Sequence, residues 1–169
     1  MQESLQDKIR FIKLLILDVD GILTDGRLWY TANGEILKAF HVHDGLGIKQ
    51  LLQAGIHVAI ITSCKNKAVS FRATKLGIQY VFQGKCDKLL PFKQLLSHLK
   101  LSENEVAYMG DDLSDLPIMQ CVRLAITVPN AVSIVQAKAH WKTKKSGGEG
   151  AVREVCDCIL NLSKIPHFK

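Results

Sequence analysis

The chain has 169 residues, of which 47% are hydrophobic and 22% are charged, and it carries a formal net charge of +6. This size and balance are typical of one globular domain, and no apolar run reaches the roughly 18 residues of a membrane span. The basic residues are scattered apart from Lys142-Thr143-Lys144-Lys145 and do not alternate with aromatics, which argues against nucleic-acid binding.

The N-terminus and the cysteines predict a cytoplasmic protein. Residues 1–8 are polar and include acids, so they do not have the pattern of a signal peptide. The five cysteines include no C-x-x-C pair, which argues against a zinc site. In a cytoplasmic chain, an odd number of cysteines indicates reduced thiols.

The first half of the chain predicts a strand, a hairpin and then alternating helices and strands. Residues 1–13 are a polar N-terminal segment that can form one helical turn. The apolar run 14–17 predicts a buried strand. Asn33-Gly34 lies between β-rich runs and predicts a hairpin over about 27–40. A polar loop over 41–47 follows, in which Asp44 can cap the next helix. The later elements are expected to be a helix over Leu46–Ala54, a strand over 57–62, a helix over about 65–76 and a strand over 80–82.

The second half continues the alternation. The expected elements are a helix over 86–99, a strand over 106–109, a short helix over 114–121, a strand over 124–128, a helix over 131–139, a short strand over 141–143 and a helix over 151–162. Residues 164–169 are expected to fray. Strands that alternate with helices predict an α/β fold with a mainly parallel sheet. Because no repeat or linker interrupts the pattern, we expect a single domain over residues 1–169.

Polar residues follow several of the predicted strands, at the sheet edge where α/β proteins bind ligands. Asp18 and Asp20 come directly after the first strand, and such carboxylates repel each other unless a cation or a reaction uses them. On these residues alone, an ordinary Asp-Gly turn explains the pair equally well. Further polar residues at later strand or helix ends are Thr62, Lys88, Asp111, Asp112 and Asp115.

These side chains have the chemistry of a phosphoryl-transfer site. Carboxylates suit Mg²⁺, which prefers oxygen ligands and keeps some of its waters. A hydroxyl and an ammonium group suit the oxygens of a phosphoryl group, and a carboxylate beside Mg²⁺ can attack phosphorus to form an aspartyl phosphate. We therefore expect the polar residues to converge on a magnesium-dependent site.

The order of the motifs resembles the haloacid dehalogenase superfamily of phosphatases. Asp18-Val19-Asp20-Gly21-Ile22-Leu23-Thr24-Asp25 looks like its first motif, and the other three are matched in order by Thr62, Lys88 and Gly110-Asp111-Asp112-x-x-Asp115. The resemblance implies a Rossmann-like core with a β-hairpin inserted after the first motif. The stretch between the first two motifs has room for a hairpin and a helix, but not for a cap domain.

Other stretches resemble a capless subfamily, the 3-deoxy-D-manno-octulosonate 8-phosphate (KDO 8-phosphate) phosphatases. They are the hairpin, Asp44-Gly45-Leu46-Gly47-Ile48 and Gly147-Gly148-x-Gly150-Ala151-Val152-Arg153-Glu154. This resemblance implies a phosphatase of lipopolysaccharide precursor synthesis that acts on a phosphorylated sugar acid. It also implies a homotetramer formed through the hairpin, in which neighbouring subunits help to close each active site.

The resemblance assigns roles to the site residues. Asp18 is expected to be the nucleophile, and Asp20 to protonate the leaving oxygen and then activate water. Thr62 and Lys88 are expected to hold phosphoryl oxygens. The expected Mg²⁺ ligands are Asp18, Asp20 through its backbone carbonyl, and Asp111, with Asp112 and Asp115 orienting them. The expected substrate-binding residues are Asp20, His41, Val42, His43, Asp44, Gly45, Lys49, Arg72 and Lys88, and Arg153 is a further candidate.

Two departures from the subfamily pattern leave alternatives open. Ser63-Cys64 stands where Gly-Arg is usual, which removes a guanidinium group expected to hold a substrate anion, and His43 stands where arginine is frequent. One alternative is a phosphatase for another sugar-acid phosphate, such as an acylneuraminate 9-phosphate. Another is a non-catalytic oligomerisation module, although every catalytic position is kept. The apolar face of the hairpin can also pack on the chain's own core instead of on another subunit.

Overall fold

Strand β1 (Leu14–Leu17) lies in the middle of a six-stranded sheet, and all four of its side chains are buried. The computed structural model describes residues 3–163. The strand order is β5-β4-β1-β6-β7-β8, and every neighbouring pair is parallel. The predicted α/β class and the mainly parallel sheet are confirmed.

The other strands of this sheet lie close to their predicted bounds. They are β4 (His57–Ile61), β5 (Tyr80–Phe82), β6 (Val106–Met109), β7 (Leu124–Thr127) and β8 (Trp141–Lys142). Because β1 pairs with both β4 and β6, the residue that follows β1 lies between the ends of these two strands. The N–H group of Asp18 donates a hydrogen bond of 3.1 Å to the Met109 carbonyl, so the strand pairing itself positions this aspartate.

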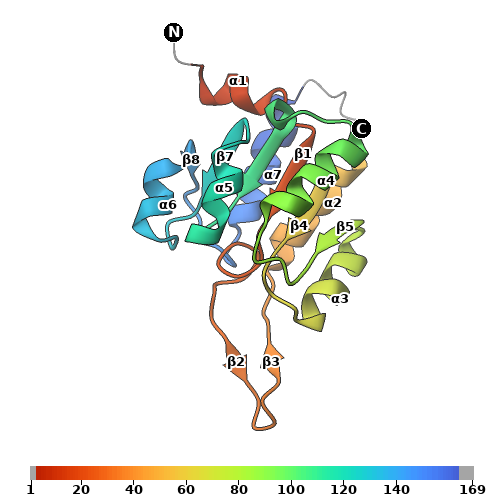
Figure 1. The fold of residues 1–169 in the computed structure, drawn as a ribbon, viewed down its shortest axis with the longest axis vertical. Helices are drawn as coiled ribbons and strands as arrows, with labels where there is room; N and C mark the ends of the chain where they lie inside the picture. Colours follow the sequence, from red (N-terminus) through yellow and green to blue (C-terminus); the bar gives the residue numbers. More distant parts are fainter. Residues whose placement is uncertain (1–2, 164–169) are drawn as a thin grey trace.

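Helices cover both faces of the sheet (Figure 1). One face carries α2 (Val42–Gln53) and α7 (Ala151–Leu162), which pack on each other, and the opposite face carries α4 (Leu89–Leu99) and α5 (Leu116–Met119). The remaining helical elements are α1 (Leu5–Ile9), α3 (Lys67–Leu76), α6 (Ser133–Lys138) and the 3₁₀ turns η1 (Glu103–Glu105) and η2 (Leu113–Asp115). Within residues 3–163, no helix is long and apolar enough to cross a membrane.

The predicted hairpin is present and extends away from the body of the molecule (Figure 1). It consists of β2 (Trp29–Tyr30) and β3 (Ile36–Leu37), which pair antiparallel. At its tip, Gly34 has a φ of +78°, a backbone conformation that favours glycine. The side chains of Trp29 and Tyr30 are mostly exposed, so this sheet does not bury its aromatics within the chain.

Two helix starts differ from prediction by three residues or more. Helix α2 begins at Val42 instead of Leu46, because the His41 imidazole accepts the N–H of His43 and caps the helix one turn earlier. Asp44, which was predicted to cap this helix, lies in its first turn and is buried. The expected loop over 41–47 is therefore mostly helical.

Helix α4 begins at Leu89 instead of Cys86. The Asp87 carboxylate accepts the N–H of Leu89 at 2.9 Å, an Asx turn that holds the preceding segment out of the helix. Lys88 therefore precedes the helix and does not lie on its solvated face. The predicted helices over 114–121 and 131–139 are shorter, and the predicted fraying of 164–169 concerns residues outside the described part of the chain.

Candidate active site

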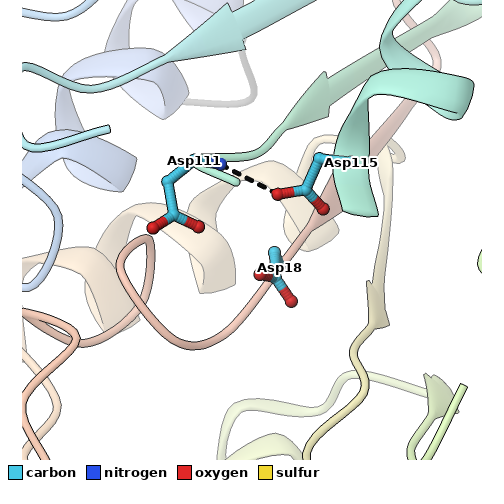
Figure 2. A group of neighbouring side chains, drawn as sticks. All are labelled: Asp18, Asp111 and Asp115. Carbon is cyan, nitrogen blue, oxygen red and sulfur yellow. Dashed lines mark hydrogen bonds between the residues drawn. The ribbon is translucent and has the colours of Figure 1, made fainter. Parts of the chain in front are cut away.

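Three carboxylates converge at the ends of β1 and β6 (Figure 2). They belong to Asp18, Asp111 and Asp115, and one oxygen of each lies within 4.8 Å of the others. Asp18 follows β1, Asp111 follows β6, and Asp115 closes the short turn η2. The predicted convergence of polar residues at this sheet edge is thus present in the fold.

Both carboxylate oxygens of Asp115 accept hydrogen bonds from other groups of the protein. Its Oδ1 accepts hydrogen bonds from Lys88 at 2.7 Å and from the Tyr108 hydroxyl at 2.5 Å. Its Oδ2 accepts the backbone N–H groups of Asp111 at 2.9 Å and of Asp112 at 3.1 Å. A carboxylate that is fully buried and bonded in this way orients its neighbours and has little capacity left to bind an ion.

Lys88 connects two of the carboxylates. Its Nζ lies 3.0 Å from Asp18 Oδ1 and 2.7 Å from Asp115 Oδ1, and only 1% of its side chain is exposed. Burial alone would lower the pKa of Lys88, but the charges of Asp18 and Asp115 raise it above its ordinary value. The ammonium group therefore stays charged beside Asp18, where a phosphoryl group would need a counter-charge.

Thr62 lies at the end of β4, next to β1, and is 1% exposed. Its N–H donates to the Phe82 carbonyl, and its hydroxyl oxygen accepts the N–H of Cys64 at 3.1 Å. These contacts fix the backbone and leave the hydroxyl proton free to donate to another acceptor. Thr62 is thus placed at the same sheet edge as the carboxylates.

The remaining carboxylates fit a bound cation. Burial, with the Asp115 charge, raises the pKa of Asp18 to about 6, and burial, with the Asp18 charge, raises the pKa of Asp111 to about 7. Within residues 3–163, Asp111 Oδ1 is buried and has no hydrogen-bond partner. A divalent cation between Asp18 and Asp111 would relieve the repulsion and give this oxygen a partner, and an all-oxygen set suits Mg²⁺. Asp112 is exposed and caps η2 instead.

A glycine loop covers the backbone of the first motif. Any side chain on Gly147 would overlap the carbonyl of Gly21, so the loop lies directly against the turn that follows Asp20. Asn130 joins the two segments, since it donates to the Gly21 carbonyl at 3.3 Å and accepts the Gly147 N–H at 2.8 Å. The C-terminal glycines therefore position the first motif.

Asp20 is paired with a lysine from the hairpin. The Asp20 carboxylate accepts a hydrogen bond from Lys38 Nζ, and the Lys38 side chain is 1% exposed although it comes from a projecting element. Asp20 and Lys38 both line a groove of about 490 Å³ between the hairpin and the segment after β4. Asp20, with 38% of its side chain exposed, is more open to solvent than the three clustered carboxylates.

Apart from Asp20 and Lys88, the predicted substrate-binding residues lie on α2, at its N-cap His41, and on α3. Arg72 donates to the His41 carbonyl at 3.1 Å and stacks over Phe40 at 5.8 Å. It lines a second groove, of about 920 Å³, which also has Lys38 in its wall. Val42, His43 and Lys49 have exposed side chains on α2. Their contact with a substrate remains a prediction.

Asp44 and Gly45 are buried where α2 meets other helices. Asp44 Oδ1 accepts the N–H of Arg153 at 2.8 Å, so it caps the N-terminus of α7 across space. A side chain on Gly45 would overlap the Arg72 guanidinium group, so the Arg72 side chain would have to move to accommodate it. The Arg153 side chain pairs with Asp157 at 2.7 Å within its own helix.

Three residues of this site were not predicted from the sequence. Lys38 and Asn130 are polar residues in a hairpin and a turn, where solvent exposure is the usual expectation, and nothing in their local sequence signals a contact with the first motif. Tyr108 did carry a signal, because a tyrosine in an otherwise apolar buried strand needs a partner for its hydroxyl. That partner is Asp115.

Comparisons with known proteins place the chain in a family. The haloacid dehalogenase-like hydrolase family matches residues 35–155. The 3-deoxy-D-manno-octulosonate 8-phosphate phosphatase of Escherichia coli strain K12 is 48% identical over 153 residues, which are 90% of this chain and 81% of that protein. The chain belongs to the KDO 8-phosphate phosphatase family of haloacid dehalogenase-like hydrolases.

Solved structures of this family have the same fold. The KDO 8-phosphate phosphatase of Yersinia pestis superposes with a TM-score of 0.91 at 46% identity and covers 93% of this chain and 85% of its own. The enzyme of Moraxella catarrhalis, solved in complex with magnesium, phosphate and KDO, gives a TM-score of 0.91 at 44% identity, with 94% of this chain and 91% of that chain covered. The predicted family is therefore confirmed, and the expected fold with it.

Proposed function

We propose that this protein is a magnesium-dependent phosphatase that converts KDO 8-phosphate into KDO and phosphate. The observation that carries the proposal is the placement of Lys88 Nζ 3.0 Å from Asp18, in a cluster where Asp111 keeps an unpartnered buried oxygen. This arrangement offers a nucleophile, a counter-charge and a cation site together. The KDO 8-phosphate phosphatases of the same family supply the choice of substrate.

The chain's own residues account for both halves of the reaction. An oxygen of Asp18 forms a bond to phosphorus while the bond from phosphorus to the sugar oxygen breaks, and Asp20 gives that oxygen its proton. Asp20 then takes a proton from water as the water oxygen attacks the phosphorus of the aspartyl phosphate. This step releases phosphate, restores Asp18 and returns the proton to Asp20. Lys88 and Thr62 hold the phosphoryl oxygens throughout.

Asp18 and Asp111 would hold the Mg²⁺ ion, together with the Asp20 carbonyl that the sequence predicts. The bound ion neutralises negative charge on the phosphoryl group. Asp115 holds the backbone of Asp111 and Asp112 in place and keeps Lys88 directed at the site. Removal of Mg²⁺ by a chelator is therefore expected to abolish phosphate release.

Mg²⁺ binding is expected to weaken as the pH falls. In the metal-free protein the pKa of Asp111 is raised to about 7 and that of Asp18 to about 6, so protons occupy these carboxylates below neutral pH and compete with the ion. Calorimetric titration should give a Kd for Mg²⁺ that is roughly tenfold or more weaker at pH 6 than at pH 8. Equal affinities at the two pH values would contradict this assignment of ligands.

The substrate itself is tested by comparing two sugar-acid phosphates. We expect kcat/KM for KDO 8-phosphate to exceed that for N-acetylneuraminate 9-phosphate by about tenfold or more, since a pocket built for one acid loses contacts with the other. The opposite preference would favour the second candidate. Ser63-Cys64 supports a phosphatase for N-acetylneuraminate 9-phosphate, because this pair offers the substrate no guanidinium group. Both residues line the groove beside Asp20. Absence of turnover with every phosphate ester would favour a non-catalytic module.

We further propose that the hairpin assembles the protein into a homotetramer. Leu28, Trp29, Tyr30 and Leu37 are each more than half exposed on an element that residues 3–163 of a single chain do not cover. A hairpin of this size is marginal alone, so burial against other copies would stabilise it.

Light scattering should therefore give a mass of about 75 kDa, four times the 18.8 kDa of one chain. Trp29→Glu should lower the mass, because it places a charge in the interface. Phe71→Glu is the control, because Phe71 is also an aromatic residue more than half exposed but lies on α3. A wild-type mass of one chain would refute the tetramer.

A cytoplasmic location is also part of the proposal. All five cysteines are free, which is typical of proteins in a reducing compartment. The substrate is a charged sugar phosphate, which does not cross membranes unaided. Fractionation of cells that express the protein, with detection of the chain in the cytoplasmic fraction, checks this location.

A further inference from the structure

The hairpin delivers one polar side chain to the active site. Lys38 directly follows β3, and its Nζ donates to Asp20, which lies 18 residues earlier in the chain. Its side chain is 1% exposed, whereas the neighbouring Leu37 is 56% exposed. A lysine ammonium is costly to bury unless it is paired, so this ion pair is a specific feature of the fold.

The chain on both sides of Lys38 is tied to the body of the molecule. The Asn66 side chain donates to the carbonyl of Ile36 at 2.8 Å and thereby joins β3 to the start of α3. On the other side, the guanidinium group of Arg72 lies over Phe40 and donates to His41. Lys38 therefore enters the site from a segment that is fixed two residues before it and two residues after it.

Lys38 is a lining residue of two grooves. Asp20 and Lys38 line the groove of about 490 Å³, and Lys38 with Arg72 lines the groove of about 920 Å³. Asp20 is the residue that must face the leaving oxygen of the substrate. A carboxyl group 38% exposed, beside an open groove, can rotate away unless something holds it.

We infer that Lys38 is the positioning residue that holds Asp20 toward the leaving oxygen. The inference rests on the proposed phosphatase function and adds a residue to it. The ammonium group fixes one carboxylate oxygen of Asp20 and leaves the other for proton transfer. It also faces the negative charge that appears on Asp20 once the proton has moved to the leaving oxygen. The hairpin is thus part of the catalytic apparatus as well as a surface for assembly.

The choice of leaving group separates this role from a purely structural one. An alkyl oxygen such as that of KDO needs a proton to leave, whereas p-nitrophenolate leaves without one. The value of kcat/KM reports the steps up to release of the leaving group, and so it isolates the step in which Asp20 acts as an acid.

The test compares Lys38→Met, Lys38→Arg and Lys65→Met on KDO 8-phosphate and p-nitrophenyl phosphate. Lys38→Met should lower kcat/KM for KDO 8-phosphate by about tenfold or more and that for p-nitrophenyl phosphate by about twofold or less. Lys38→Arg keeps the charge and should restore most of the lost activity. Lys65→Met is the control, because Lys65 lines the same groove but is exposed.

Three results would overturn the inference. Equal losses on the two esters would make Lys38 a structural or phosphate-binding residue, and no loss would remove its role. A rise in KM for KDO 8-phosphate alone, with kcat retained, would mean that Lys38 binds the sugar acid directly. If the wild-type enzyme instead hydrolyses another alkyl phosphate, the proposed substrate fails, and the same comparison on that ester decides the role of Lys38.

Discussion

Asp18→Asn is expected to lower kcat for phosphate release by about 10⁴-fold or more, because an amide cannot form the aspartyl phosphate. The structure provides the reason for choosing Asp18 among the clustered carboxylates. Asp115 uses both of its oxygens within the protein, whereas Asp18 pairs with Lys88 through Oδ1 and keeps 9% of its side chain exposed. Steady-state kinetics with saturating substrate and Mg²⁺ measures the effect.

A second aspartate near the site serves as the control for this variant. Asp87→Asn keeps the acceptor oxygen that bonds the N–H of Leu89, so its kcat should stay within about twofold of the wild type. Thermal unfolding should show that Asp18→Asn remains folded. Retention of more than a hundredth of wild-type kcat by Asp18→Asn, on the scale of losses known for catalytic nucleophiles, would contradict the assignment of the nucleophile.

Lys88→Met is expected to destabilise the fold as well as inactivate the enzyme. Lys88 is the buried cation between Asp18 and Asp115, and its loss leaves two buried carboxylates without a counter-charge. The free energy of unfolding should fall by about 3–5 kcal/mol at pH 8 in the absence of Mg²⁺. Urea unfolding with a chelator present measures this change.

The pH dependence of this loss has a defined sign. The pKa of Asp18 is already raised to about 6, by burial first and then by Asp115, and the removal of Lys88 raises it further. A group whose pKa is raised by folding binds protons more strongly in the folded state, so the variant gains stability as the pH falls from 8 toward 5. The deficit relative to the wild type should therefore shrink at pH 5. Lys93→Met, an exposed lysine on the same helix, should change stability little at either pH.

The central part of the fold could be predicted because its signals are local. Four consecutive apolar residues before Asp18 indicate a strand buried on both faces, and the parallel sheet then brings the later strand ends together. The order of the four motifs along the chain indicates the family, since it specifies which strand end carries which polar group. The family and the α/β fold were predicted for these reasons.

The predictions that were wrong concern the starts and caps of helices, each of which depends on a hydrogen bond to a single side chain. Helix α2 begins earlier than predicted because of His41, and helix α4 begins later because of Asp87. Each side chain accepts a backbone N–H group, and at the end of a helix such a hydrogen bond determines the first residue more strongly than the periodicity of apolar residues does. Asp44 was expected to cap its own helix, but tertiary packing uses it to cap α7. Local sequence does not contain this information.

The Asp20–Lys38 ion pair could not be predicted for a related reason. A lysine in a hairpin is normally solvated, and only the complete fold brings this one back to the first motif. The residues expected to bind the sugar acid remain predictions, because the exposure of side chains such as His43 and Lys49 does not indicate what they bind.

The most direct measurement is phosphate release from KDO 8-phosphate by the purified wild-type protein, with Mg²⁺ and then with excess chelator. We expect rapid release that stops when the ion is removed and returns when Mg²⁺ is restored, because Asp18 and Asp111 need the cation between them. The Asp18→Asn variant in the same assay should release no detectable phosphate. Release that is unaffected by the chelator, or equal in the Asp18→Asn variant, would contradict the proposed active site.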